Sequence, residues 1–180
     1  MHEQALLEQA AKIRLAVFDV DGVLTDGRLY YGPEGEALKV FHSRDGLALK
    51  ALARSGIQVA IISGRQHAGV NVRMQQLGID EVHQGIEQKL PVLEGIMQRA
   101  GVTAEETCFT GDDWNDAPVM RATGLAFAPC DAAGPLHHLA HYVTRHGGGL
   151  GAVREICELL LCAHQKLYIL ETIGLDDGSN

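Results

Sequence analysis

The stretch FDVDGVLTDG, residues 18–27, places Asp19 and Asp21 directly after a short apolar run. A carboxylate can act as a nucleophile, and a second carboxylate two residues later can donate or accept a proton at the same reacting group. Gly22 allows the sharp turn that brings both side chains into one pocket. This pattern indicates phosphoryl transfer, in which Asp19 attacks phosphorus and Asp21 acts as general acid and then as general base for water.

A second acidic cluster, GDDWND at residues 111–116, follows another apolar run and contains Asp112 and Asp113. If the strands before the two clusters are neighbours, four carboxylates converge on one pocket, where each raises the pKa of the others. A hard divalent cation removes this conflict, and Mg²⁺ is the common choice when the substrate is a phosphate. The backbone carbonyl of Asp21 is a further candidate ligand.

Phosphate oxygens also need donors, and two later segments can supply them. In IISGR, residues 61–65, Ser63 and the backbone N–H groups of Ser63 and Gly64 stand at a predicted strand end, before a helix. Lys89 begins a predicted helix and supplies a cation that offsets charge in the transition state. Arg44, Arg65 and Lys39 are candidates for an anionic substrate group, and Arg65 is favoured because it directly follows the Ser-Gly pair.

The elements that must position these residues alternate along the chain. The apolar run 15–18 predicts a strand buried on both faces, and 28–41 predicts a β-hairpin around a Gly-Pro turn. Further strands are expected at 57–63, 79–85, 107–111, 125–129 and 141–144, and helices at 3–11, 45–56, 68–78, 89–100, 116–124, 135–140 and 152–163. This order predicts an α/β fold with a doubly wound, Rossmann-like parallel sheet, and puts the acidic clusters beyond the carboxyl ends of its strands.

Composition limits the class of protein. The chain has 180 residues, which suits one domain over 1–180, with a polar tail from residue 174 that we expect to be disordered. A net charge of −8 without a Lys/Arg block argues against binding nucleic acid or an anionic membrane. No apolar run is long enough for a membrane span and no basic leader begins the chain, so the cytoplasm is the expected location.

Cysteine and histidine bind metals in many proteins, but in this sequence both are expected to have structural roles. The cysteines at 108, 130, 157 and 162 lack paired spacing and are expected to be inert thiols. HHLAH, with His137, His138 and His141, lacks the glutamate of an HExxH zinc motif, which favours a solvated or interface helix face.

The quartet of Asp19-x-Asp21, Ser63, Lys89 and Gly111-Asp112-Asp113-x-x-Asp116 resembles the four motifs of the haloacid dehalogenase superfamily of phosphatases. More narrowly, the segments DVDGVLTDG, RDGLAL, ISGR, GDDWNDAPVM and GGGLGAVREICELLL resemble the bacterial 3-deoxy-D-manno-octulosonate 8-phosphate phosphatases over about residues 12–163. The remaining residues, 164–180, form a tail that this resemblance does not cover.

The resemblance implies a fold without a cap domain, in which the hairpin after the first strand acts as a flap. It implies an Mg²⁺-dependent phosphomonoesterase of lipopolysaccharide biosynthesis, with Asp19, the carbonyl of Asp21 and Asp112 as metal ligands. Asp113 and Asp116 would support the metal shell. It also implies a homotetramer in which hairpins pack together and a neighbouring subunit closes each site, so that a sugar phosphate reacts away from bulk water.

Trp114 and Asn115 depart from the family pattern, which has an aliphatic residue after GDD and no Asn before the last Asp. The departure leaves substrate selectivity open, and a phosphatase of a nine-carbon, sialic-acid-type 9-phosphate is the alternative within the class. From other classes, a signalling receiver domain is disfavoured because no Asp follows the third parallel strand and Lys89 precedes the second acidic cluster. A non-catalytic assembly module is disfavoured by the intact quartet.

Overall fold

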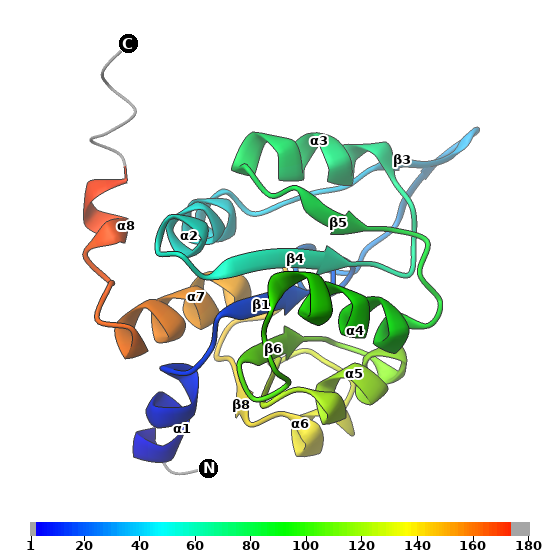
Figure 1. The fold of residues 1–180 in the computed structure, drawn as a ribbon. Helices are drawn as coiled ribbons and strands as arrows, with labels where there is room; N and C mark the ends of the chain where they lie inside the picture. The colour runs from blue at the N-terminus through cyan, green and yellow to red at the C-terminus, as the bar shows by residue number, and fades with distance from the viewer. Residues whose placement is uncertain (1–2, 174–180) are drawn as a thin grey trace.

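A computed structural model describes residues 3–173. Its main sheet has six parallel strands in the order β5-β4-β1-β6-β7-β8 (Figure 1). They are β1 (Leu15–Phe18), β4 (Gln58–Ile62), β5 (Glu81–His83), β6 (Thr107–Thr110), β7 (Leu125–Ala128) and β8 (Tyr142–Val143). An antiparallel hairpin, β2 (Tyr30–Gly32) and β3 (Gly35–Leu38), projects from the sheet directly after β1. The predicted parallel α/β sheet with a hairpin flap is confirmed, and the described residues contain no separate cap domain.

Helices cover both faces of the sheet. One face carries α1 (Glu3–Ala10), α2 (Ser43–Arg54), α3 (Ala68–Leu77), α7 (Ala152–Ala163) and α8 (Ile169–Thr172). The other carries α4 (Lys89–Ala100), α5 (Ala117–Ala122) and α6 (Leu136–Leu139). No helix in residues 3–173 combines the length and the apolar character needed to cross a membrane.

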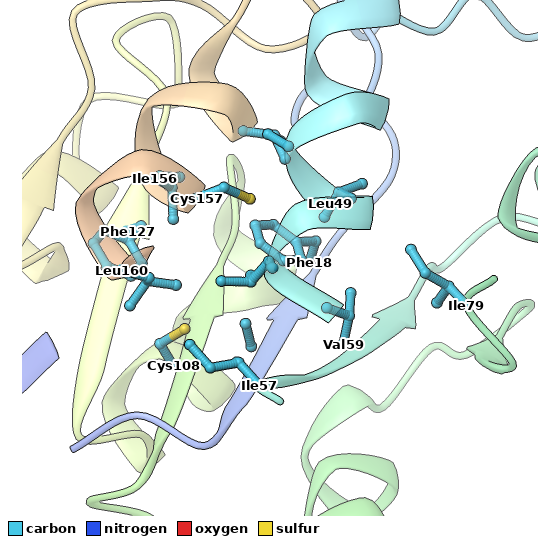
Figure 2. Close-up of a cluster of buried hydrophobic side chains, with 14 of the residues drawn as sticks. Phe18, Leu49, Ile57, Val59, Ile79, Cys108, Phe127, Ile156, Cys157 and Leu160 are labelled. Atoms are coloured by element: carbon cyan, nitrogen blue, oxygen red, sulfur yellow. The ribbon is translucent and has the colours of Figure 1, made fainter. Parts of the chain in front are cut away.

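Each central strand is buried on both faces because successive side chains enter opposite layers of the core. In β1, Phe18 packs towards α2 and α7, whereas Val17 packs towards α4 and α5. Figure 2 shows the first layer, in which Phe18 lies close to Leu49 of α2, and Cys157 and Ile156 of α7 belong to the same cluster. All four cysteines are free thiols: Cys108 and Cys157 are buried in the core, and Cys130 and Cys162 are exposed.

Local sequence signals explain where several helices begin and end. The side chain of His67 accepts a hydrogen bond from the N–H of Gly69 at 3.0 Å and so caps α3. The helix ends at Gly78, whose φ of 72° suits glycine. The predicted helix at 116–124 is divided: a 3₁₀ turn, η1 (Trp114–Asp116), precedes α5. Asp113 and Asp116 form a reciprocal capping box around this turn, which the sequence analysis did not anticipate.

The carboxyl ends of the parallel strands lie along one edge of the sheet, and β1 occupies its switch point. From β1 the chain adds β4 and then β5 on one side, and then crosses through α4 to add β6, β7 and β8 on the other side. β1 therefore pairs with β6, as the convergence of the two acidic clusters required. The tail at 164–180 contains a short helix, α8, that was not predicted, and the segment expected to be disordered, 174–180, lies outside the described residues.

Candidate active site

Acidic residues of both clusters meet beyond the ends of β1 and β6. Asp19, Asp112 and Asp116 offer carboxylate oxygens that lie within 4.8 Å of one another, the one such group of three or more acids, histidines or cysteines in residues 3–173. Asp19 is held by a hydrogen bond from its backbone N–H to the carbonyl of Thr110, at 3.0 Å. Pairing of β1 with β6 thus sets the separation of the two clusters.

The loops that carry these acids pack tightly. Gly22 has φ 84°, and a Cβ at this position would overlap the Asp112 carboxylate. The carboxylate of Asp116 accepts a hydrogen bond from the backbone N–H of Asp112 at 3.1 Å, so it braces the loop that carries Asp112. A glycine at 22 therefore serves a close approach between the two acidic loops as well as a turn.

Lys89 lies between Asp19 and Asp116. Its Nζ is 2.8 Å from a carboxylate oxygen of Asp19 and 2.6 Å from one of Asp116, and its side chain is 1% exposed. Burial lowers the pKa of Lys89, but the charges of Asp19 and Asp116 outweigh burial and raise it. The ammonium is therefore a permanent positive charge beside the carboxylate of Asp19.

The cluster still carries more negative than positive charge. Burial, followed by repulsion from Asp116, raises the pKa of Asp19 to about 7, although Lys89 opposes the shift. Burial and repulsion from Asp19, Asp116 and Asp113 raise the pKa of Asp112 to about 8. A divalent cation bound to these oxygens would relieve the repulsion, and a set of carboxylate oxygens fits Mg²⁺. Both carboxylate oxygens of Asp116 are engaged, one by Lys89 and one by the Asp112 backbone, and Asp19 also contacts Lys89 through one oxygen.

An open cleft lies over this cluster. It is lined by residues from the β1 loop, the hairpin base and the loops after β4 and β6, namely Asp19, Asp21, Gly27, Leu29, Gly64, Arg65, Asp112, Asp113 and Asn115. Carboxylate, backbone and guanidinium groups thus surround one space, which suits a phosphate ester bound near a metal ion. Gly27, Leu29 and Asn115 were not predicted as site residues, because a residue that lines a cleft through a loop leaves no periodic signal.

The predicted phosphate-binding segment lies beside the cleft. Ser63 is buried at the end of β4, where its backbone N–H bonds to the carbonyl of His83 at 2.8 Å and its Oγ accepts a hydrogen bond from the N–H of Arg65 at 3.3 Å. The Arg65 guanidinium donates to Glu36 at 3.0 Å and to the Tyr31 hydroxyl at 3.1 Å, both on the hairpin. Arg65 thus connects the phosphate-side loop to the flap.

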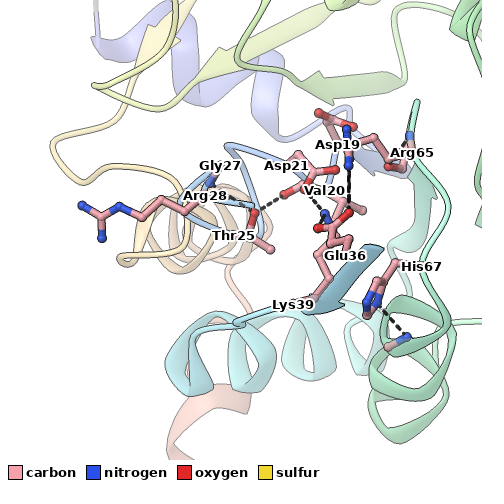
Figure 3. Close-up of polar contacts among 12 residues, drawn as sticks. Asp19, Val20, Asp21, Thr25, Gly27, Arg28, Glu36, Lys39, Arg65 and His67 are labelled. Atoms are coloured by element: carbon pink, nitrogen blue, oxygen red, sulfur yellow. Dashed lines mark hydrogen bonds and ion pairs between the residues drawn. The ribbon is translucent and has the colours of Figure 1, made fainter. Parts of the chain in front are cut away.

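Asp21 faces the hairpin. Its carboxylate pairs with Lys39, and Lys39 also pairs with Glu36 at 2.6 Å (Figure 3). Lys39 was a candidate for binding an anionic substrate group, whereas in the structure its ammonium is engaged by two of the protein's own carboxylates. Glu36 was missed altogether.

Three features singled out in the sequence lie away from the cleft. Arg44 lines a separate surface pocket with His42, Arg145, His146 and Arg154, so a single chain does not bring Arg44 to the phosphate side. Trp114 is 58% exposed and does not line the cleft. The ring of His141 accepts a hydrogen bond from the backbone N–H of Ala126 at 2.9 Å, which gives that histidine a structural part at the start of β7.

Comparisons with known proteins identify the family. The sequence profile of the haloacid dehalogenase-like hydrolases matches residues 33–124. The chain is 44% identical over 162 residues to the 3-deoxy-D-manno-octulosonate 8-phosphate phosphatase of Yersinia pestis, covering 90% of this chain and 87% of that protein.

Solved structures agree with this assignment. The phosphatase of the same name from Moraxella catarrhalis, in complex with magnesium, phosphate and KDO, superposes with a TM-score of 0.92 at 36% identity, over 96% of this chain and 99% of the other. The cobalt-bound enzyme of Haemophilus influenzae gives a TM-score of 0.88 at 40% identity, over 92% and 97%. The chain belongs to the haloacid dehalogenase-like hydrolases and is a close homologue of the 3-deoxy-D-manno-octulosonate 8-phosphate phosphatases.

Proposed function

We propose that this protein is an Mg²⁺-dependent phosphatase that hydrolyses 3-deoxy-D-manno-octulosonate 8-phosphate to the free sugar acid and phosphate. The observation that carries the proposal is the convergence of Asp19, Asp112 and buried Lys89 at the switch point of the sheet. The substrate is supported by relatives of that name at 44% identity over 90% of the chain.

In the first half of the reaction, Asp19 attacks phosphorus and the bond from phosphorus to the sugar oxygen breaks. Asp21 gives its proton to that oxygen, so the sugar leaves as an alcohol and the phosphate stays on Asp19. In the second half, Asp21 takes a proton from water, which attacks phosphorus and releases phosphate from Asp19.

The remaining groups bind and orient the substrate. Lys89 holds Asp19 in place and offsets negative charge as it builds on the phosphate oxygens. The Ser63 hydroxyl and the Gly64 N–H can donate hydrogen bonds to the phosphate, whereas the Ser63 N–H, which was also predicted as a donor, is engaged by the carbonyl of His83. Arg65 can bind an anionic group of the sugar. Mg²⁺, bound by Asp19, the carbonyl of Asp21 and Asp112, would polarise a phosphate oxygen and neutralise its charge. Asp113 and Asp116 would support this shell.

The direct test measures phosphate release with and without Mg²⁺ from eight-carbon and nine-carbon acid sugar phosphates, hexose phosphates and p-nitrophenyl phosphate. We expect an Mg²⁺-dependent preference for the eight-carbon compound and no turnover by Asp19→Asn. A preference for the nine-carbon compound, or an even spread over the panel, would retain the phosphatase and refute the assigned substrate. An active Asp19→Asn variant would exclude Asp19 as the nucleophile.

We propose further that the enzyme is a cytoplasmic homotetramer in which the hairpins pack together, as the family resemblance implies. Leu29 and Val40 are 43% and 51% exposed at the base of the hairpin, which leaves apolar surface for such packing. Charged residues placed at both positions should yield monomers by light scattering. A tetramer that persists in this variant would remove the hairpin from the assembly.

A further inference from the structure

Lys39 follows the last residue of β3 and is the feature of the hairpin that the reaction above does not use. Its side chain is 2% exposed, although neighbouring residues of the hairpin such as Tyr31, Leu38 and Val40 are exposed. A lysine ammonium loses its hydration when it is buried, so it stays there only where carboxylates compensate. Here Asp21 and Glu36 provide them, with the Glu36 oxygen 2.6 Å away.

Glu36 fixes the position of the ammonium. Burial raises the pKa of Glu36, but hydrogen bonds from Lys39 and Arg65 outweigh burial and hold this pKa below its ordinary value. Glu36 is therefore a carboxylate between two cations, and it contacts Lys39 through one oxygen and Arg65 through the other. The result is a chain of alternating charges that runs from Arg65 through Glu36 and Lys39 to Asp21 (Figure 3).

Asp21 is the end of this chain that reaches the cleft. Its backbone is fixed by a tight turn, in which the N–H groups of Val23, Leu24 and Thr25 all bond to the carbonyl of Val20. The turn does not fix the side chain, which can still rotate about χ1 and χ2. The Lys39 ammonium holds the carboxylate on the hairpin side, whereas the ammonium of Lys89 holds Asp19. Two buried lysines thus contact the two carboxylates separately.

Lys39 itself is not among the residues that line the cleft, whereas Asp21 is. Its ammonium lies between Asp21 and Glu36, so we expect its effect on the reaction to pass through Asp21.

We propose that Lys39 is a positioning residue, held by Glu36, that orients the general acid Asp21 towards the leaving-group oxygen. This inference rests on the proposed function, because it assumes that Asp21 protonates the departing alcohol. It also gives the hairpin a task within its own subunit: the flap carries the residue that orients the acid.

The test compares leaving groups that differ in their need for a proton. Phenyl and p-nitrophenyl phosphate have similar shapes, but phenolate is the more basic leaving group and depends more on general acid catalysis. We would measure kcat/KM for both at saturating Mg²⁺ in the wild type, Lys39→Met, Glu36→Gln and Asp21→Asn, with Lys12→Met as an exposed-lysine control. The ratio of the two values within one sample does not depend on how much of that sample is folded and active.

In Lys39→Met we expect the preference for p-nitrophenyl phosphate over phenyl phosphate to rise roughly tenfold, a part of the contribution of general acid catalysis. Asp21→Asn should raise it at least as much, Glu36→Gln should raise it less, and Lys12→Met should leave it unchanged. If Lys39→Met keeps the wild-type ratio while Asp21→Asn raises it, the positioning role is refuted and the proposed function stands. If Asp21→Asn also keeps the wild-type ratio, Asp21 is not the general acid, and the positioning role of Lys39 is refuted together with that part of the proposed function.

Discussion

Replacing Lys89 with methionine removes the positive charge from the centre of the acidic cluster while keeping most of the buried stem. The Lys89 ammonium lies 2.8 Å from Asp19 and 2.6 Å from Asp116, in a site where the lysine side chain is 1% exposed. Breaking a buried ion pair by deleting one partner costs about 3–5 kcal/mol. For a domain of this size, such a loss lowers the melting temperature by roughly 6–20 °C.

The same change should slow catalysis by a separate route. By analogy with the loss of one preorganised donor, loss of this charge beside the Asp19 carboxylate should cost about 2.7–4 kcal/mol, or about 10²–10³ in kcat. We therefore expect Lys89→Met to lose this factor in kcat at saturating Mg²⁺ and substrate, under conditions where the variant is still folded. Lys12→Met, which changes an exposed lysine before the start of β1, at the opposite end of the strand from the site, should keep the wild-type rate.

Melting curves with EDTA and with Mg²⁺ separate the two effects. Without a metal ion, the variant leaves Asp19, Asp112 and Asp116 with no buried cation among them, so the loss of stability should be largest in EDTA. Because a ligand of the native state stabilises it by mass action, Mg²⁺ should raise the melting temperature of the variant more than that of the wild type. A variant with the wild-type kcat, or with an unchanged melting temperature in EDTA, would refute this account of Lys89.

Three further changes test single positions in the structure, one at Glu155 of α7 and two in loops that meet near the acidic cluster. Burial raises the pKa of Glu155, but hydrogen bonds between its carboxylate and the side chains of Tyr142 and His146 outweigh burial and hold this pKa below the ordinary 4.5. The contribution of Glu155 to stability is therefore present above about pH 4.5 and is lost as the pH falls through the pKa of the folded state. Glu155→Gln should therefore lower the melting temperature at pH 7, and the difference from the wild type should shrink towards pH 4; a constant difference would contradict this. A Cβ at Gly148 would overlap the backbone of Gly22, so Gly148→Ala should lower the free energy of unfolding in urea by about 1–3 kcal/mol and reduce activity. As a control, Gly134→Ala, whose Cβ would meet open space, should change neither quantity. Gly22→Ala should displace the Asp112 carboxylate and raise the Mg²⁺ concentration for half-maximal activity, and an unchanged Mg²⁺ titration would show that the loop can yield.

Much of the architecture followed from local pattern. The buried run at 15–18, the hairpin signal at 28–41 and the helix at Lys89–Ala100 lie where they were predicted, because periodicity and turn residues act over a few neighbours. The meeting of Asp19 with Asp112 was predicted on the condition that the two strands before them are neighbours, and the folded sheet meets that condition by pairing β1 with β6. The nucleophile, the metal-binding acids and Lys89 could therefore be proposed from residue types at strand and helix ends.

The tertiary structure decided which charged groups meet. Nothing in the spacing of Lys39 distinguishes it from a solvated lysine, yet the hairpin folds back over Asp21 and buries the ammonium between two carboxylates. Arg44 appeared equally suited to an anionic substrate and lies in a different pocket. The sequence pattern determines which segments form strands and helices, and therefore which residues stand at the end of a strand. The direction and burial of a long charged side chain depend on segments that approach it only after the chain has folded, and these segments determine which charges surround it.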